Sequence, residues 1–152
     1  LGEMRSDVIN DNSSYSDSNK KVKWVTEAMT LTPNDSGTVF LIDQNSGAYA
    51  ITLPDCASKD NEMMGWYADF ILHSVASNAV TIIASTDDGD NIHGIGIDGE
   101  DGAAQTVTEG TGVDVITIIS GATKGDRVSL VCDGDSYYVF SLAADKAHIT
   151  FT

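Results

Sequence analysis

Basic residues are scarce in this chain of 152 residues, which has 8 Lys and Arg against 23 Asp and Glu. The formal net charge of −15 argues against a nucleic-acid partner, because affinity for phosphate comes from Lys and Arg that displace counterions. The same charge argues against anionic membrane surfaces, and no apolar run approaches the ~20 residues that span a bilayer. We therefore expect no nucleic acid and no membrane among the partners, whereas a protein with a basic face would suit this chain.

Cysteine is also rare. Cys56 and Cys132 are far apart in the sequence, and neither belongs to a C-x-x-C motif. A chain of this length buries roughly 68–70% of its unfolded surface, so it needs neither a disulfide nor a metal to hold a core. We interpret the two cysteines as small buried hydrophobic residues. A disulfide between them is the alternative, although nothing in the sequence requires an oxidising compartment.

The common catalytic motifs are missing. The sequence contains no G-x-S-x-G, no H-E-x-x-H and no Walker loop. His73, His93 and His148 lie far apart, without a Cys or His at ligand spacing, so we expect surface or half-buried rings rather than zinc ligands. Carboxylate pairs single out nothing among so many acids. We therefore predict no enzymatic activity, no catalytic residues, no metal ligands and no cofactor.

The sequence is rich in short alternating apolar runs separated by turn residues. The run at residues 65–73, for example, places Trp66, Ala68, Phe70 and Leu72 on one side. Such runs at roughly 8–12-residue spacing predict an all-β fold. We expect a single β-sandwich or jelly-roll-like domain of about eight to ten antiparallel strands, with one short helical turn at 55–64. Two later runs also group apolar residues on one face: Val128, Leu130 and Cys132, and then Tyr138, Phe140 and Leu142.

The N-terminal segment differs from the rest of the chain. Residues 6–19 are mostly Ser, Asp and Asn, and a segment of this composition buries too little apolar surface to order itself. We therefore predict a polar, extended N-terminal arm at residues 1–21 and a β-sandwich domain at residues 22–152.

Six residues are candidates for partner contact. Three of the eight basic residues fall in one short stretch, which is conspicuous in so acidic a chain, and three aromatic residues are predicted to be exposed. Two alternatives stay open: the lysines begin a solvated strand, and the aromatic rings cover the rim of the core. The six candidates are Lys20, Lys21, Lys23, Trp24, Tyr67 and Tyr137.

Residues 87–102, DDGDNIHGIGIDGEDG, combine acids with the pattern Gly94-x-Gly96-x-x-Gly99. A dinucleotide loop needs a helix after its glycines, but EDGAAQTVTEG follows Gly99 and is acidic where phosphate would lie. Isoleucines alternate with the glycines, as in a strand that bulges or packs closely. We predict turns and a short connecting strand. Bound calcium stays open, although the EF-hand order is not met.

Four segments, taken in order, resemble small β-rich structural proteins of tailed bacteriophages, especially head decoration (cement) proteins. The segments are LTPNDSGTVFLIDQNSGAYAITLP (31–54), GWYADFIL (65–72), GDNIHG (89–94) and DRVSLVCDGDSYYVF (126–140). The resemblance implies a homotrimer that binds the major capsid protein on the outer capsid surface of a virion and stabilises the shell. The alternative is a tail-fibre or spike β-sandwich module that binds host-surface carbohydrate. A third reading, a small hydrolase with two carboxylates, lacks any sequence feature of its own.

Overall fold

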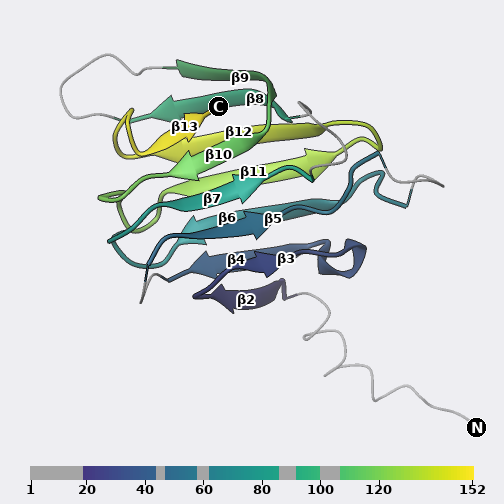
Figure 1. The fold of residues 1–152 in the computed structure, drawn as a ribbon, viewed down its shortest axis with the longest axis horizontal. Coiled ribbons are helices and arrows are strands. Elements are labelled where there is room, and N and C mark those ends of the chain that lie inside the picture. The colour runs from purple at the N-terminus through teal and green to yellow at the C-terminus, as the bar shows by residue number, and fades with distance from the viewer. Residues whose placement is uncertain (1–18, 44–46, 58–61, 86–91, 100–106) are drawn as a thin grey trace, which may run out of the picture.

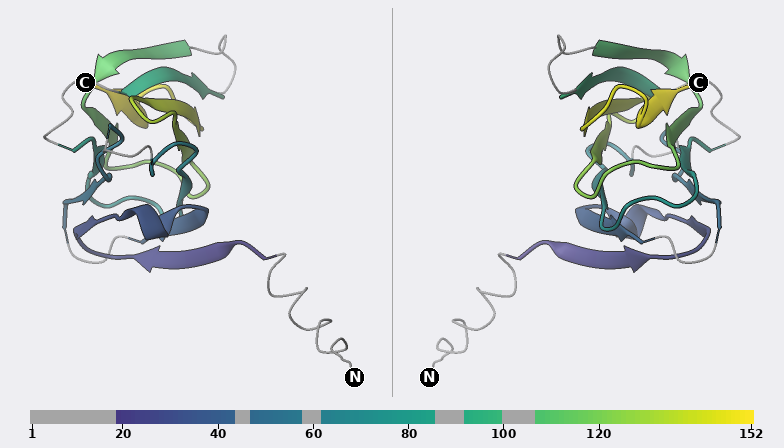
Figure 2. Two further views of the ribbon diagram at one scale, coloured as in Figure 1. Left: turned by 90° about the vertical axis from the view of Figure 1, so that its right-hand side faces the viewer. Right: turned by 90° about the vertical axis from the view of Figure 1, so that its left-hand side faces the viewer.

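Two β-sheets pack face to face in a sandwich (Figures 1 and 2). The computed structural model describes residues 19–43, 47–57, 62–85, 92–99 and 107–152. The seven-stranded sheet has the order β2-β4-β6-β11-β12-β8-β9. Its strands are β2 (Lys21–Val25), β4 (Thr38–Ile42), β6 (Tyr67–Leu72), β8 (Ile92–Asp98), β9 (Val107–Val113), β11 (Arg127–Cys132) and β12 (Tyr137–Ala143). The predicted all-β sandwich is therefore confirmed.

The five-stranded sheet forms the other layer, in the order β13-β10-β7-β5-β3. The strands of this sheet are β3 (Met29–Thr30), β5 (Tyr49–Thr52), β7 (Val80–Ile83), β10 (Val115–Ile118) and β13 (Ile149–Phe151).

The predicted arm falls almost wholly on residues 1–18, which lie outside the described residues. In the described part of the chain, no helix is long and apolar enough to cross a membrane.

The strand directions differ from the prediction. From β2 to β7 the chain alternates between the sheets, so β2, β4 and β6 run parallel in one and β3, β5 and β7 run parallel in the other. Parallel neighbours need a crossover connection, and here each crossover is itself a strand of the opposite sheet. The expectation of antiparallel strands is wrong for this half, and seven plus five strands exceed the predicted eight to ten.

The second half of the chain is mainly antiparallel. Strand β10 pairs antiparallel with β7 and β13, and β11 pairs antiparallel with β6 and β12. Strand β8 runs parallel to β12 and antiparallel to β9. The seven-stranded sheet thus continues without a break from β2 at one edge to β9 at the other (Figure 1).

The core lies between the sheets and is built from alternate residues of each strand. The buried rings of Phe40 and Phe70 stack within it, with their centroids 5.1 Å apart. The alternation predicted for the run at 65–73 is confirmed, and so is that of 126–134. All seven inward residues are buried: Trp66, Ala68, Phe70, Leu72, Val128, Leu130 and Cys132.

Strand β12 departs from the expected orientation. Tyr138, Phe140 and Leu142 share a face, as predicted, but each is 46% exposed because that face points away from the core. Tyr137 points inward instead and is fully buried, and its hydroxyl donates a 2.7 Å hydrogen bond to the carbonyl of Pro54. The prediction that Tyr137 is an exposed contact residue is therefore wrong. Both alternating sets of this run are largely apolar, so only its pairing in the sheet decides which set faces inward.

The described residues contain one short helix, the 3₁₀ helix η1 (Pro33–Asp35). In the segment 55–64, where a helical turn was expected, residues 56–57 and 62–64 form turns, and residues 58–61 lie outside the described residues. Thr32 and Pro33 begin the helix, and the Asp35 carboxylate accepts a 2.8 Å hydrogen bond from the backbone N–H of Thr32. These are the usual signals of a helix N-terminus, compressed here into one turn.

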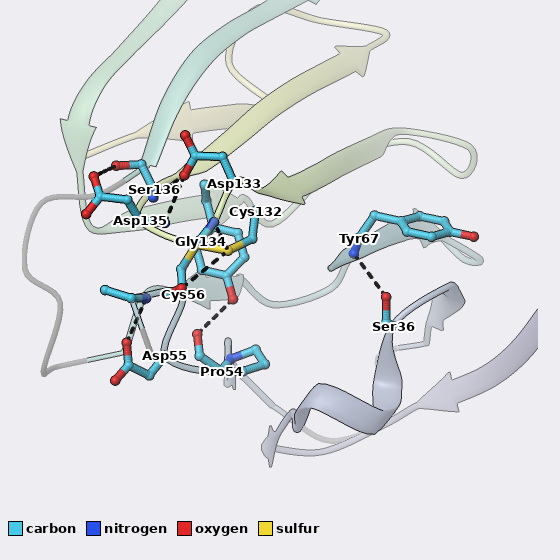
Figure 3. The surroundings of a disulfide bond; sticks show 12 residues. Ser36, Pro54, Asp55, Cys56, Tyr67, Cys132, Asp133, Gly134, Asp135 and Ser136 are labelled. Atoms are coloured by element: carbon cyan, nitrogen blue, oxygen red, sulfur yellow. Dashed lines mark hydrogen bonds between the residues drawn. A yellow bond between two sulfur atoms is a disulfide. The ribbon is translucent and has the colours of Figure 1, made fainter. Parts of the chain in front are cut away.

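Cys56 and Cys132 form a disulfide (Figure 3). Both residues are buried, as predicted, but they are not the two separate hydrophobic residues that the sequence favoured. Cys56 follows β5 of one sheet, and Cys132 ends β11 of the other, so the bond ties the two layers together. Their Cα atoms are 6.0 Å apart, within the usual range of roughly 4.4–6.8 Å for disulfides.

The glycine-rich motif is part of a strand. Gly94 and Gly96 lie within β8, which has a register shift at Ile92 and His93, so the expected strand that bulges and packs closely is confirmed. A Cβ atom at Gly94 would collide with the backbone carbonyl of Val139 on β12. Gly94 and Gly96 thus belong to a strand rather than to a loop. The turns predicted around this strand fall on residues 86–91 and 100–106, outside the described residues.

Candidate functional site

The outer face of the seven-stranded sheet, which points away from the core, is unusually apolar. Its exposed apolar side chains range from 39% exposure at Ile95 to 57% at Trp24. Four further apolar side chains of the same face are half-buried between them. We define the outer apolar face as Val22, Trp24, Val39, Leu41, Tyr67, Ile71, Ile95, Ile97, Val131, Tyr138, Phe140 and Leu142.

These side chains form rows because the strand register aligns them. Residues paired across neighbouring strands point to the same side of the sheet. Trp24 thus begins a row that runs across six strands and contains one polar member, Arg127. A second row joins β6, β11, β12 and β8 through Tyr67, Val131, Tyr138 and His93. The row between these two contains one polar pair, Asp69 and Ser129, so the rows form one largely apolar surface around that pair. The first row is Trp24, Leu41, Ile71, Arg127, Leu142 and Ile97.

A shallow hollow of about 300 Å³ lies over β6, β11 and β12. Tyr67 and Tyr138 contribute to its wall, and Ser129 donates a 2.6 Å hydrogen bond to the Asp69 carboxylate beneath it. The ring of Tyr67 extends over Gly37, where a Cβ atom would meet the Tyr67 hydroxyl at 3.2 Å. The lack of a side chain at Gly37 therefore leaves room for this ring. The outward residues that line the hollow are Tyr67, Asp69, Ser129, Val131, Tyr138 and Phe140.

Charge on this face is balanced, unlike the chain as a whole. Lys20 lies 3.6 Å from the Asp69 carboxylate, measured from Nζ to Oδ2. Arg127 and Glu109 are the other charged outward residues of the described strands. At the rim, a hydrogen bond to the Asp133 carboxylate, and its charge, raise the pKa of Tyr138. Most of the acidic residues that the structure describes therefore lie elsewhere.

The six predicted contact residues separate into three groups. Trp24 and Tyr67 belong to the outer apolar face, and Lys20 borders it through Asp69. Lys21 and Lys23 point to the other side of β2, where Lys21 donates a 3.2 Å hydrogen bond to the Asn34 carbonyl and Lys23 pairs with Asp35. Tyr137 lies in the core.

Ten of the twelve residues of this face were not identified as contacts from the sequence. For the exposed residues of β12, the available signal was a run, SYYVFSLA, that is largely apolar in both of its alternating sets. A strand with two apolar sets is expected to be covered on both faces. The missed residues of β11 and β12 are Val131, Tyr138, Phe140 and Leu142, and Ile95 of β8 pairs with Phe140.

The outermost strand, β2, is fixed to the sheet by aromatic and ionic contacts. The indole of Trp24 packs edge-on against the imidazole of His73, with ring centroids 4.4 Å apart. On the other side, the ammonium of Lys23 contacts the Asp35 carboxylate. Burial acts to raise the pKa of Asp35, but hydrogen bonds from Lys23 and Thr32 outweigh it and hold that pKa below 3.8.

The lowered pKa of Asp35 predicts that acid weakens the contact between Asp35 and Lys23 of β2. A lowered pKa of Asp35 in the folded state adds stability above the unfolded value of 3.8, and that stability is lost as pH falls through the folded value. We expect the melting temperature of the wild type to fall more steeply below about pH 3.8 than that of Asp35→Asn. Thermal melts followed by circular dichroism between about pH 2 and 5 will measure it. Parallel curves for the two proteins would contradict the assignment.

The histidines are half-buried, as predicted, and make structural contacts. His93 accepts a 3.1 Å hydrogen bond from the backbone N–H of Gly112. His148 lies 2.8 Å from Asp126, whose buried carboxylate also accepts hydrogen bonds from the N–H groups of Thr123 and Ala144. Asp126 therefore joins the turn before β11 to the segment between β12 and β13. Within the described ranges, no group of three or more His, Cys, Asp or Glu is arranged to hold a metal ion.

Most of the acidic residues of segment 87–102 that could bind calcium lie outside the described residues. Of these residues, Asp98 is described, and it is buried at the end of β8.

The chain matches no protein-family model and no sequence among curated proteins. The outer apolar face therefore stands as the candidate functional site on the evidence of its own residues.

Proposed function

We propose that this chain is a structural binding module of a tailed bacteriophage, a decoration or cement protein that sits on the outer capsid surface and stabilises the shell. The observation that supports it best is the outer apolar face. Monomeric proteins rarely expose such a continuous apolar surface, and larger patches usually mark contacts with other macromolecules. A binding module needs such a surface, and it needs no catalytic group.

The edge at β2 is the second part of the proposal. Three lysines lie at or beside this strand, where the polar N-terminal segment joins the domain. A polar segment that orders on binding can extend over a neighbouring protein surface, at the cost of its conformational entropy. We propose that β2 and the segment before it contact the major capsid protein. Many such contacts on one shell reinforce each other through multivalency.

A tail-fibre or spike module that binds carbohydrate is the second candidate. The hollow over β6, β11 and β12 favours it, because Tyr67 and Tyr138 line that hollow and aromatic rings have amphipathic faces on which ligands stack. This hypothesis predicts that Tyr67→Ala and Tyr138→Ala each abolish binding to a glycan array while the fold is retained.

The copy number of this protein in purified particles of its phage tests the proposal. We expect a number comparable to that of the major coat protein, measured by quantitative mass spectrometry of virion digests. A few copies per particle would instead indicate a tail component, and glycan binding would then be tested. Absence from particles would contradict both candidates and reopen the question of a small enzyme.

A further inference from the structure

The hollow over β6, β11 and β12 exists because a small residue stands among larger ones. Ser129 lies at its floor, paired with Asp69 on one side and with Phe140 on the other, and the rings of Tyr67 and Tyr138 contribute to the wall. Alternate side chains of a strand stand on the same face, so one small side chain leaves a depression between its neighbours. The volume of about 300 Å³ is at the lower end of the range for ligand pockets, roughly 300–1,000 Å³, and fits one side chain or small group.

The hollow contains a negative charge without a basic residue in its lining. Asp69 supplies the carboxylate, and none of the described residues that line the hollow is basic. Lys20 approaches from the edge of the sheet, with its Nζ 3.6 Å from Asp69 Oδ2, but its side chain is 65% exposed. An ion pair this open adds little stability, so another cation can replace Lys20. Arg127 stands in the neighbouring row, outside the lining.

The hydrogen-bonding groups of the hollow favour a cation over a sugar or an anion. The Ser129 hydroxyl already donates its hydrogen bond to Asp69, at 2.6 Å. The Tyr138 hydroxyl is hydrogen-bonded to Asp133 at the rim, and the Tyr67 hydroxyl extends over the residue before β4, on the opposite side of β6 from β11. An anion needs donors from the protein, and a sugar needs donors as well as acceptors. A cation needs only a carboxylate and aromatic rings, and the hollow has both.

Among cations, a guanidinium fits this arrangement best. It is planar, stacks on aromatic rings and forms two hydrogen bonds with one carboxylate, whereas the ammonium of lysine is compact and strongly hydrated. Arginine is also enriched among the side chains that anchor protein interfaces.

We propose that the hollow binds an arginine side chain of a partner protein, with its guanidinium paired to Asp69 and packed against the rings of Tyr138 and Phe140. The inference rests on the proposed function in taking the partner of the outer apolar face to be a protein. It assigns that protein one anchoring contact, at the single carboxylate of the hollow.

An NMR titration of the full chain with a tripeptide, arginine between two glycines and blocked at both ends, tests this inference. The matched probe carries citrulline, which keeps the shape of arginine and removes its charge. We expect saturable shifts of the Ser129 backbone amide with the arginine peptide and binding about 10-fold weaker with the citrulline peptide. Methyl glucoside is the third probe, and we expect no saturable shift with it.

Two acidic residues of the same row provide a matched pair of variants. Asp69→Asn should weaken binding of the arginine peptide about 10-fold, because the amide keeps an acceptor for Ser129 but carries no charge. Glu109→Gln also removes one acid from this row, four strands away from Asp69 or about 19 Å. That distance exceeds the screening length of about 8 Å at physiological ionic strength, so binding should change less than about 2-fold.

Removing the competing ammonium should act in the opposite direction. Lys20→Ala should strengthen binding of the arginine peptide about 2- to 5-fold, since it frees the Asp69 carboxylate from an exposed ion pair. Lys21→Ala removes the same charge from the other side of β2 and should leave binding unchanged. A gain in affinity cannot result from misfolding, so this pair remains informative even if circular dichroism shows Asp69→Asn to be unfolded.

Binding that prefers arginine to citrulline, weakens in Asp69→Asn and strengthens in Lys20→Ala supports the inference. The absence of a saturable shift, equal binding of the two peptides, or binding that neither variant alters would overturn it. Binding of methyl glucoside in place of the arginine peptide would also overturn it, in favour of the carbohydrate-binding module. A chain abundant in virions that does not bind the arginine peptide would lose this site and keep the proposed function. A chain that binds the peptide but is absent from virions would keep the site and lose that function.

Discussion

Replacing both Cys56 and Cys132 with Ala will lower the free energy of unfolding by about 4 kcal/mol, the largest effect we expect from any change outside the face. The disulfide joins residues separated by 76 positions, so it removes a large loop-closure entropy from the unfolded chain. It also links β11 of one sheet to the loop after β5 of the other. Without the disulfide, the hydrogen bond from the Tyr137 hydroxyl to the Pro54 carbonyl still connects the same region.

Urea unfolding of the wild type with and without reductant, beside the double Ala variant, measures this effect. The reduced wild type and the double variant should unfold at similar urea concentrations, both well below the oxidised wild type. Reductant should leave the double variant unchanged, which serves as the internal control. If all four samples share one midpoint, the disulfide contributes no stability and the prediction fails. Disulfides persist in oxidising environments, so we expect the full stability only where the protein is not in a reducing cytosol.

Gly94→Ala is expected to cost about 3 kcal/mol or more, because two penalties combine. Gly94 has a φ of +144°, a backbone conformation that residues with a Cβ rarely adopt. Its new methyl group would also collide with the Val139 carbonyl, and neither atom can move without displacing β8 from β12. The glycine is thus required by close strand packing rather than by a phosphate group.

Gly99→Ala is the matched control within the same motif. A Cβ atom at Gly99 would meet only the carbonyl of Ala143, at an ordinary distance of 3.9 Å. We expect this variant to unfold within about 0.5 kcal/mol of the wild type in urea. Equal losses at Gly94 and Gly99 would contradict the packing explanation. A nucleotide loop would show a different pattern, in which both substitutions reduce nucleotide binding while stability changes little.

Virion copy number tests whether the chain is a decoration protein. The outer apolar face gives this proposal a specific location, since charged residues are sparse along one face of one sheet while the chain carries −15 overall.

Much of the local structure followed from the sequence alone. Apolar alternation predicted the buried side of β6 and β11, because a strand with one dry face and one wet face repeats every two residues. The alternation of isoleucine with glycine in residues 94–97 predicted a strand, and the alternative was a dinucleotide-binding loop. Of the three aromatic residues predicted to be exposed, Trp24 and Tyr67 are exposed and Tyr137 is buried.

What the tertiary structure decided concerns relations between distant segments. Spacing predicts strands but not whether the next strand pairs in the same sheet or crosses to the other, so the parallel first half was not foreseen. Pairing with β11 and β8 turned Tyr137 inward and Tyr138 outward, although both alternating sets of β12 are apolar. The proximity of Cys56 and Cys132 likewise arises only when the two sheets stack. Alternation along a strand is local, whereas sheet order, facing and cross-links depend on contacts that no single segment contains.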